Sequence, residues 1–414
     1  MKIVFSGERS LVAPLTWGQR HVMRQRTALS LGRVVDTPPV LVALAADAVT
    51  ALVGRHEALR TRLIGPDRPE ELPADLADGV AELVRQEVAE TGELPVEVLR
   101  CDADEAEAVA EDARLRLAGR AFNHVEEWPL RVALVVVDDI VRHVALVCSP
   151  LAVDDHGMEL VVKDLGLLLR GALPVRSAAQ PADLATEVAE RQRTGHDLTD
   201  RAIRFWRGEL RRVGRVAAPE GEPAAATLRS TALGNAAHTI AVRHGVRAST
   251  VYLAGTAKVL GTLTGQPTIA LRTVVSNRFY PDRRDVVAAI AQDGLVVLDL
   301  AVPSFGDLVS QTWRTVVRAH RFARYDPDRL ARSVFGEAPR PFACVDDRQL
   351  GNREQSPAVP RPVGGCHLTI GRGEVTLQSD TALVPVEESL RALENLLFSA
   401  AYQAKPERVV SPRR

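Results

Sequence analysis

The sequence predicts an α/β protein built from mixed layers of helices and strands, and three observations carry that prediction. Residues 144–148 (VALVC) form a short apolar run with the length and composition of a buried strand. Residues 157–169 repeat leucine and valine at helical spacing, which makes one face of a helix apolar. Between them lies a polar loop, and such strand–loop–helix junctions are where many α/β proteins keep their chemistry. The length of 414 residues exceeds one ordinary core and predicts two domains.

The N-terminal part alternates strand and helix patterns, with Thr16 as the N-cap of the first helix. Residues 132–148 read as a hairpin that turns at Asp138-Asp139. Residues 64–93, which are rich in Pro, Asp, Glu and Ala, predict a loop with a short helix. The other expected elements are a strand at 3–5, a helix at 41–59, a strand at 95–99 and a helix at 105–120.

The stretch 171–181, with its small residues and prolines, predicts a boundary between two subdomains. Beyond it, 214–226 reads as a flexible connector. The expected elements are helices at 184–210, 249–263, 305–322 and 386–401, strands at 268–275, 295–300, 342–346 and 375–380, a proline-rich loop at 355–362 and a disordered tail at 409–414.

The composition is that of a globular protein without a nucleic-acid or membrane partner. Hydrophobic residues make up 46%, charged residues 25%, and 52 basic residues balance 53 acidic ones to a net charge of −1. No apolar run approaches the roughly 18 residues of a membrane span, and the N-terminus lacks a signal-peptide segment. The four cysteines are scattered without a C-x-x-C pair, which predicts free thiols in the cytoplasm and no zinc site.

Several strings resemble the motifs of the condensation domains of nonribosomal peptide synthetases. Residues 55–63 (RHEALRTRL) match the family's second motif almost letter for letter. The loop after residue 148 resembles the family's His-His-x-x-x-Asp-Gly: Ser149 and Pro150 stand where the two histidines would be, Asp154 keeps the aspartate, and Asp155 replaces the glycine. Weaker matches extend the resemblance from residue 16 to residue 401, and include Phe205-Trp206, Thr264-Gly265-Gln266 and Asn277-Arg278.

The resemblance implies two chloramphenicol-acetyltransferase-like subdomains, at 1–175 and 182–414, in a V-shaped pseudo-dimer with a central tunnel. It also implies a buried ion pair between Asp154 and Arg60, with Arg62 in reserve, that holds the loop without doing chemistry. Five residues are expected to line the tunnel: Pro150, Ser276, Asn277, Gln292 and Asp293.

The usual chemistry of the family is in doubt here, because its second histidine serves as general base or positioning group. Pro150 has neither a titratable group nor a backbone N–H. Three nearby side chains are alternative catalytic candidates. His156 is the one histidine near the loop in sequence, although a histidine at a helix start more often caps the helix or faces water. Ser149 is a nucleophile type without an evident base, and Asp155 adds a carboxylate, too few with Asp154 for a metal site.

Two hypotheses follow from the resemblance, and both imply an acyl or peptidyl carrier protein with its phosphopantetheine arm as partner, with no cofactor bound directly. In the first, the chain holds a carrier-bound thioester or recruits a tailoring enzyme such as a cytochrome P450. The X domain of glycopeptide assembly lines does this, and it too lacks the second histidine and has paired aspartates. In the second, it is an acyltransferase that forms an amide or ester through His156 or by positioning alone. A free-standing acyltransferase with soluble donors is a third possibility.

Overall fold

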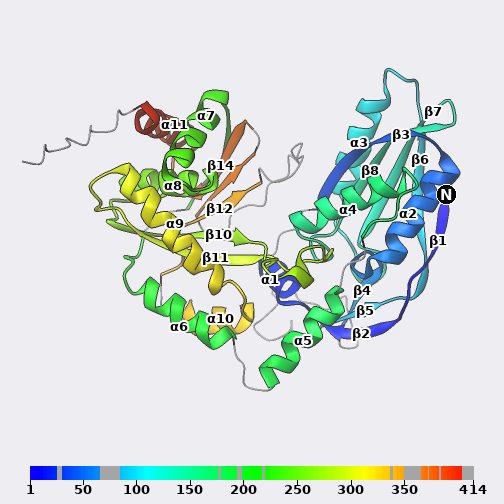
Figure 1. Ribbon diagram of the computed structural model, residues 1–414, viewed down its shortest axis with the longest axis horizontal. Coiled ribbons are helices and arrows are strands. Elements are labelled where there is room, and N and C mark those ends of the chain that lie inside the picture. Colours follow the sequence, from blue (N-terminus) through cyan, green and yellow to red (C-terminus); the bar gives the residue numbers. More distant parts are fainter. Residues whose placement is uncertain are drawn as a thin grey trace, which may run out of the picture.

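The chain folds into two lobes, each built around one large sheet (Figure 1). This computed structural model describes residues 1–25, 30–65, 84–175, 179–193, 198–216, 220–335, 339–348, 365–371, 373–381 and 384–402. Strands and helices are mixed in both lobes, which confirms the predicted α/β class. Within these residues, no helix is both long enough and apolar enough to cross a bilayer.

The first lobe has a five-stranded sheet of order β1-β6-β7-β8-β3. Its strands are β1 (Lys2–Ser6), β3 (Leu31–Leu41), β6 (Thr91–Arg100), β7 (Leu130–Val137) and β8 (Ile140–Cys148). The predicted hairpin is β7–β8, and its two turn residues, Asp138 and Asp139, have φ angles of 50° and 61°. Such positive angles belong to the tight turn whose twist matches the flanking strands.

Every residue of β7 is buried because helices cover both faces of this sheet. One face packs against α2 (Val42–Arg55) and α4 (Asp155–Leu168), and the other against α3 (Ala106–Ala118). A central strand covered on both sides needs apolar residues at every position, which explains the continuous apolar run.

A smaller sheet of order β2-β5-β4 lies beside the first lobe. It consists of β2 (Leu11–Pro14), β4 (Thr61–Ile64) and β5 (Arg85–Val88), and η1 (Glu57–Arg60) leads into β4. A loop with a short helix was predicted at 64–93. The described residues of that range differ from this prediction, because they contain β5 and the start of β6. Residues 66–83 lie outside the described part.

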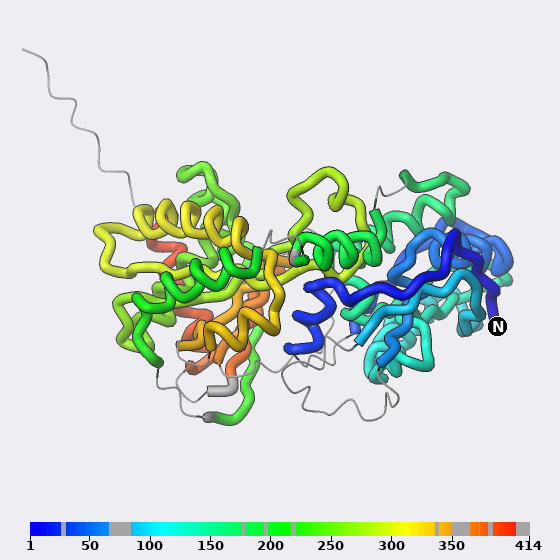
Figure 2. The backbone as a smooth tube through the Cα atoms, turned by 90° about the horizontal axis from the view of Figure 1, so that it is seen from below, coloured from blue at the N-terminus to red at the C-terminus, as the bar shows by residue number. Residues whose placement is uncertain are grey.

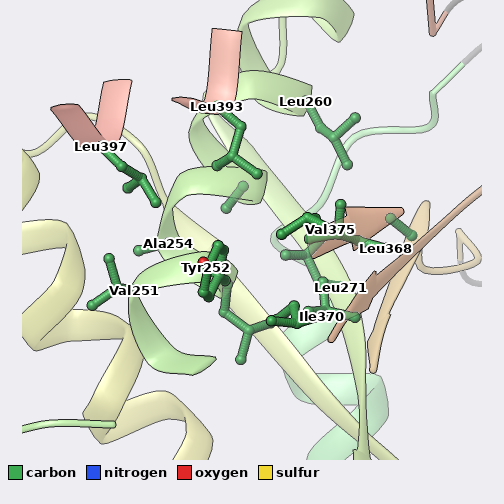
Figure 3. Close-up of a cluster of buried hydrophobic side chains, with 14 of the residues drawn as sticks. Val251, Tyr252, Ala254, Leu260, Leu271, Leu368, Ile370, Val375, Leu393 and Leu397 are labelled. Carbon is green, nitrogen blue, oxygen red and sulfur yellow. The ribbon is translucent and has the colours of Figure 1, made fainter. Parts of the chain in front are cut away.

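The second lobe has a six-stranded sheet of order β11-β10-β12-β13-β14-β9. Its strands are β9 (Glu220–Arg229), β10 (Thr268–Val275), β11 (Gln292–Asp299), β12 (Ala343–Asp347), β13 (Cys366–Ile370) and β14 (Glu374–Thr381). Four helices, α7 (Thr231–His244), α8 (Ala248–Thr264), α9 (Phe305–Arg321) and α11 (Val386–Tyr402), cover one face. Figure 3 shows the resulting core, where Tyr252 and Leu393 meet Leu271 and Leu368.

Two expectations for the second half need correction. The connector predicted at 214–226 is wrong: residues 220–229 form β9, an edge strand in which Pro223 is tolerated because β9 pairs only with β14. The single helix predicted at 184–210 is two helices, α5 (Pro181–Arg193) and α6 (Leu198–Leu210). The elements α7 and β13 were not predicted. The proline-rich loop at 355–362 and the tail at 409–414 lie outside the described residues.

Two helices each pack against elements from the other half of the sequence. Helix α1 (Trp17–Gln25) lies between the lobes in both views (Figures 1 and 2) and packs against β11 and α10 (Pro327–Val334) of the second lobe. Its start is a reciprocal cap, in which Thr16 and Gln19 bond each other's backbone N–H groups. Helix α5 belongs to the second half of the sequence and packs against β2 and η1 of the first. The division at 175–182 stays a prediction, and these two helices bind the halves together.

Candidate functional site

The loop between β8 and α4 forms a tight turn that aims its aspartate at the other lobe. The carbonyl of Ser149 accepts hydrogen bonds from the N–H groups of Ala152 (3.0 Å) and Val153 (3.1 Å). Asp154 then takes the N-cap position of α4, where its Oδ1 accepts from the N–H of Gly157 at 2.8 Å. Its backbone N–H donates to the carbonyl of Ala288, which belongs to the segment between β10 and β11.

Asp154 makes a buried ion pair across the two lobes, and its partner is Arg278. Nη1 of Arg278 donates to Oδ2 of Asp154 at 2.7 Å, and the two side chains are 3% and 11% exposed. The same Oδ2 accepts from the N–H groups of Ile290 and Ala291, both at 3.0 Å. The carboxylate is therefore fully occupied by four donors, three of which come from the second lobe.

The electrostatics of this pair favour the charged carboxylate. Burial alone would raise the pKa of Asp154, but the Arg278 charge and the hydrogen bonds from Arg278, Gly157 and Ile290 outweigh it and lower that pKa below its usual range. Arg278 is fixed in turn by the carbonyls of Ser276 (3.2 Å), Val286 (3.1 Å) and Ala288 (2.9 Å), reached by its two terminal nitrogens. The pair is a structural clamp.

The predicted ion pair between Asp154 and Arg60 is wrong. Arg60 is only 1% exposed, but its Nη1 donates to the carbonyls of Arg9 (3.0 Å) and Ala89 beside the small sheet. Burial lowers the pKa of Arg60, and the nearby Arg9 charge adds to that effect. The reserve candidate Arg62 also lies elsewhere, with its guanidinium 3.7 Å above the ring of Trp128. The motif at 55–63 thus secures the first lobe internally.

Ser149 and Pro150 occupy the turn directly after β8. Ser149 is fully buried, and its Oγ accepts from the N–H of Leu151 at 3.1 Å and lies 3.5 Å from Nδ1 of His124. Burial, with a smaller contribution from the Arg131 charge, lowers the pKa of His124 to about 4 although the Glu127 charge opposes it, so its imidazole is neutral at pH 7. A buried hydroxyl bonded to its own turn suits a structural role better than attack on a substrate.

Asp155 and His156 open α4, and they differ in exposure. His156 is exposed, and its Nε2 lies 3.3 Å from the carbonyl of Arg284, so this nitrogen carries the proton. Loss of hydration lowers the pKa of His156, and the Arg278 charge lowers it further, which leaves a neutral ring with Nδ1 unprotonated. Asp155 is half-buried and is one of the charges felt by Arg348 at the end of β12.

Most of the residues that were expected to line the tunnel from the second lobe make hydrogen bonds within the fold. Their tunnel-lining role, like that of Pro150, stays a prediction. Asn277 adopts a left-handed conformation (φ 57°), and its Nδ2 donates to the carbonyls of Ile290 and Ala323. Gln292 Nε2 donates to the carbonyl of Tyr325 at 2.8 Å. Ser276 is half-buried and contributes its carbonyl to Arg278.

Asp293 is the centre of a second buried charge cluster. Arg272 Nη1 donates to its Oδ2 at 2.9 Å, and His21 Nε2 of α1 lies 3.5 Å from its Oδ1. Burial alone would raise the pKa of Asp293, but His21 and Arg272 outweigh it and hold that pKa well below the usual range. The cluster therefore joins α1 to the second sheet.

The sequence-based search missed Arg272 and Arg278. An arginine inside the apolar strand 268–275 is itself a signal, because a charge in a buried strand requires a partner. Arg278 belonged to a matched family segment, yet nothing local links it to an aspartate more than 120 positions earlier. No group of three or more His, Cys, Asp or Glu side chains in the described ranges is arranged to hold a metal ion.

No family model and no curated protein matches the sequence. The structure, however, is similar to the condensation domain of the monacolin K polyketide synthase MokA, with 17% identity, a TM-score of 0.77, and coverage of 96% of this chain and 99% of that one. It is also similar to SgcC5 from Streptomyces globisporus, with 18% identity, a TM-score of 0.72, and coverage of 94% and 98%.

The X-domain from teicoplanin biosynthesis is a third similar structure. The isolated domain has 16% identity and a TM-score of 0.69, with coverage of 96% of this chain and 97% of that one. The same domain in its complex with OxyB has 17% identity and a TM-score of 0.68, with coverage of 96% and 95%.

Proposed function

We propose that this chain, which has the fold of condensation domains, engages a carrier-bound acyl or peptidyl thioester in nonribosomal peptide or polyketide biosynthesis as a binding or recruitment component. One observation carries the proposal: the turn that would supply the catalytic histidine supplies Pro150 instead. The remaining polar groups of that turn are committed elsewhere, since Asp154 is held by four donors and Ser149 is buried against its own turn. Condensation by the family's usual proton transfer lacks its base here.

The retained scaffold supports the binding half of the proposal. The clamp between Asp154 and Arg278 keeps the loop and the facing segment 286–291 in contact, although the loop has lost its histidine. The teicoplanin X-domain shares the fold and has been solved in complex with OxyB, so this fold also serves as a protein-binding module. By analogy, the partners proposed here are a carrier protein with its phosphopantetheine arm and a tailoring enzyme such as a cytochrome P450.

A second candidate, an active acyltransferase, is favoured by His156. Its ring is neutral, and the contact of Nε2 with the Arg284 carbonyl leaves Nδ1 as a proton acceptor. It would take the proton of an attacking amine or hydroxyl while the carrier thiolate leaves. Positioning without a base is the variant of this candidate in which His156 has no role.

The test uses a cognate carrier protein that is loaded with an acyl group and supplied with an amine acceptor. Carrier binding is measured by calorimetry, and amide formation by mass spectrometry. Binding without product is expected. Product that disappears in His156→Ala with the fold intact supports the acyltransferase instead, because a general base contributes about 10²–10⁴-fold. Product that survives this substitution indicates catalysis by positioning, and absence of binding refutes both candidates.

A further inference from the structure

A group of arginines gathers where α5 meets the segment between β10 and β11. Glu187 of α5 accepts a hydrogen bond from Nη2 of Arg283 at 2.6 Å. Its other carboxylate oxygen lies 2.8 Å from Nε of Arg191, one helical turn further along α5. Arg283 ends the short helix η4 (Pro281–Arg283), and its side chain is only 7% exposed. One carboxylate therefore holds two guanidiniums that come from different parts of the chain.

A third arginine, Arg324, lies in the turn between α9 and α10. It follows Ala323, whose carbonyl accepts a hydrogen bond from Nδ2 of Asn277 at 3.0 Å, so this turn lies against the start of the same segment. Arg324 is half-buried. Among the residues that the structure describes, none makes a hydrogen bond or an ion pair with its guanidinium. A partly buried arginine without such a partner is uncommon, because burial of a charge requires compensation.

Arg283 is itself incompletely paired. Its Nε is buried and has no hydrogen-bond partner within the described ranges, and the nearest further carboxylate, that of Asp282, lies 3.6 Å from this nitrogen. Three guanidiniums thus share two carboxylates, and Arg283 already contacts both of them. No carboxylate is left over for Arg324.

The electrostatics reflect this excess of positive charge. Burial, together with the Arg283 and Arg191 charges, lowers the pKa of Arg324 to about 10, although Glu187 and Tyr280 oppose it. Arg324 still carries its charge at neutral pH, and that charge is held near two like charges. This arrangement destabilises the free protein, and a negatively charged group from outside the chain would relieve it.

The arrangement suits a terminal phosphate better than a carboxylate or a phosphodiester. Each guanidinium presents its N–H groups in a planar fork that matches the oxygens of a phosphate. The three forks come from three chain segments, and a terminal phosphate offers three free oxygens, whereas a diester and a carboxylate offer two. Solvent reaches this place, because the side chain of Arg191 is 53% exposed and Tyr280 is 55% exposed.

The group also lies where the two halves of the sequence meet. Helix α5 packs against β2 and η1, whereas η4 belongs to the segment that continues to Ile290 and Ala291, the donors to Asp154. The residue after Arg283, Arg284, offers its carbonyl to Nε2 of His156. An anion that joins α5, η4 and the turn after α9 would therefore stabilise the segment that holds the candidate site's loop.

We propose that Arg191, Arg283 and Arg324 form a binding site for a terminal phosphate group, supplied either as inorganic phosphate or as a phosphate monoester. The proposal does not depend on whether the chain engages a carrier-bound thioester. The bound phosphate gives Arg324 its missing partner and links the three chain segments that carry the arginines.

The experiment measures the binding of four anions to the full chain by calorimetry, at neutral pH and at an ionic strength held constant with sodium chloride. Inorganic phosphate is expected to bind with a Kd of about 1 mM or below, at least tenfold tighter than dimethyl phosphate and acetate. The fourth anion is methyl phosphate. If it binds like phosphate, the site accepts a phosphate monoester; if it binds as weakly as dimethyl phosphate, the site is specific for the free ion.

The variant Arg324→Gln tests the unpaired guanidinium. It should weaken phosphate binding at least tenfold. In chloride buffer it should also raise the Tm by about 1–2 °C, because it removes a half-buried charge without a partner, whereas loss of a structural arginine would lower the Tm. Arg324→Lys keeps the charge and should retain part of the affinity.

The matched control is Arg193→Gln on the same helix α5. Arg193 is 75% exposed and pairs with Glu190 at 2.7 Å, so its loss should change neither the phosphate affinity nor the Tm. Three results would overturn the proposal: no phosphate binding at tens of millimolar, acetate or dimethyl phosphate binding as tightly as phosphate, or an unchanged phosphate affinity in Arg324→Gln. A lower Tm of Arg324→Gln in chloride would also overturn it, since Arg324 would then have a partner in the free protein.

Discussion

Replacing Asp154 should destabilise the protein more than any exposed charge, because this carboxylate holds the two lobes together. It accepts hydrogen bonds from Arg278 (2.7 Å), Gly157 (2.8 Å), Ile290 (3.0 Å) and Ala291 (3.0 Å). Asp154→Ala leaves the Arg278 guanidinium buried without a counter-ion and three backbone N–H groups without an acceptor. Loss of one partner of a buried pair costs about 3–5 kcal/mol.

The control is Asp36→Ala, which removes a carboxylate that is 89% exposed and paired with His143 at 2.9 Å. Exposed pairs of this kind contribute about 0–1 kcal/mol. Unfolding free energies of wild type and both variants come from urea denaturation followed by circular dichroism. A loss at Asp154 within about 1 kcal/mol of that at Asp36 would refute the clamp.

A double-mutant cycle separates the observed partner of Asp154 from the one the sequence suggested. Asp154 and Arg278 should be coupled, so that Arg278→Met costs much less in the Asp154→Ala background than alone. Asp154 and Arg60 should be additive to within about 0.5 kcal/mol, because Arg60 bonds the carbonyls of Arg9 and Ala89. Coupling to Arg60 with additivity at Arg278 would contradict the structure.

Three further predictions test other parts of the fold. Burial lowers the pKa of His124 to about 4, so at acidic pH the unfolded chain binds a proton that the folded chain does not. The free energy of unfolding should therefore fall by about 2–3 kcal/mol as the pH drops from about 6.5 to 4. The variant His124→Gln should flatten that dependence. In Gly18→Ala the new Cβ would lie 2.4 Å from the carbonyl oxygen of Ala289, so the free energy of unfolding in urea should fall by about 1–3 kcal/mol. The control is Gly234→Ala, which has open space around it and should not lower that free energy. A thiol reagent should label at most one cysteine, Cys101, in the native protein, since the other three are buried; rapid labelling of two would contradict that burial.

The sequence predicted the elements whose patterns are long and regular. The helix at 386–401, the hairpin at Asp138-Asp139 and the cap at Thr16 appear where expected, because each depends on local spacing or turn chemistry. The connector predicted at 214–226 overlaps β9, because Pro and Ala disfavour strands but pairing with β14 overrides that preference.

The site was predictable as a loop but not as a set of contacts. Motif similarity located the loop at 149–155 and suggested that Asp154 has an arginine partner. Arg60 was the expected partner because it lies in the strongest motif. The observed partner is Arg278, because the segment 276–291 of the second lobe contacts the loop of the first.

The two roles of Asp154 explain why a loop that lacks its histidine can keep its aspartate. As N-cap it accepts from Gly157 and starts α4, and as ion-pair partner it binds Arg278 and the backbone at Ile290 across the lobes. Neither role requires a proton to move, so neither depends on the residue at position 150. A histidine in place of Pro150 would therefore restore only a titratable group. If Pro150→His gives the chain amide-forming activity with a loaded carrier, the scaffold is competent and only the base is missing; if it binds but stays inactive, the scaffold is specialised for holding.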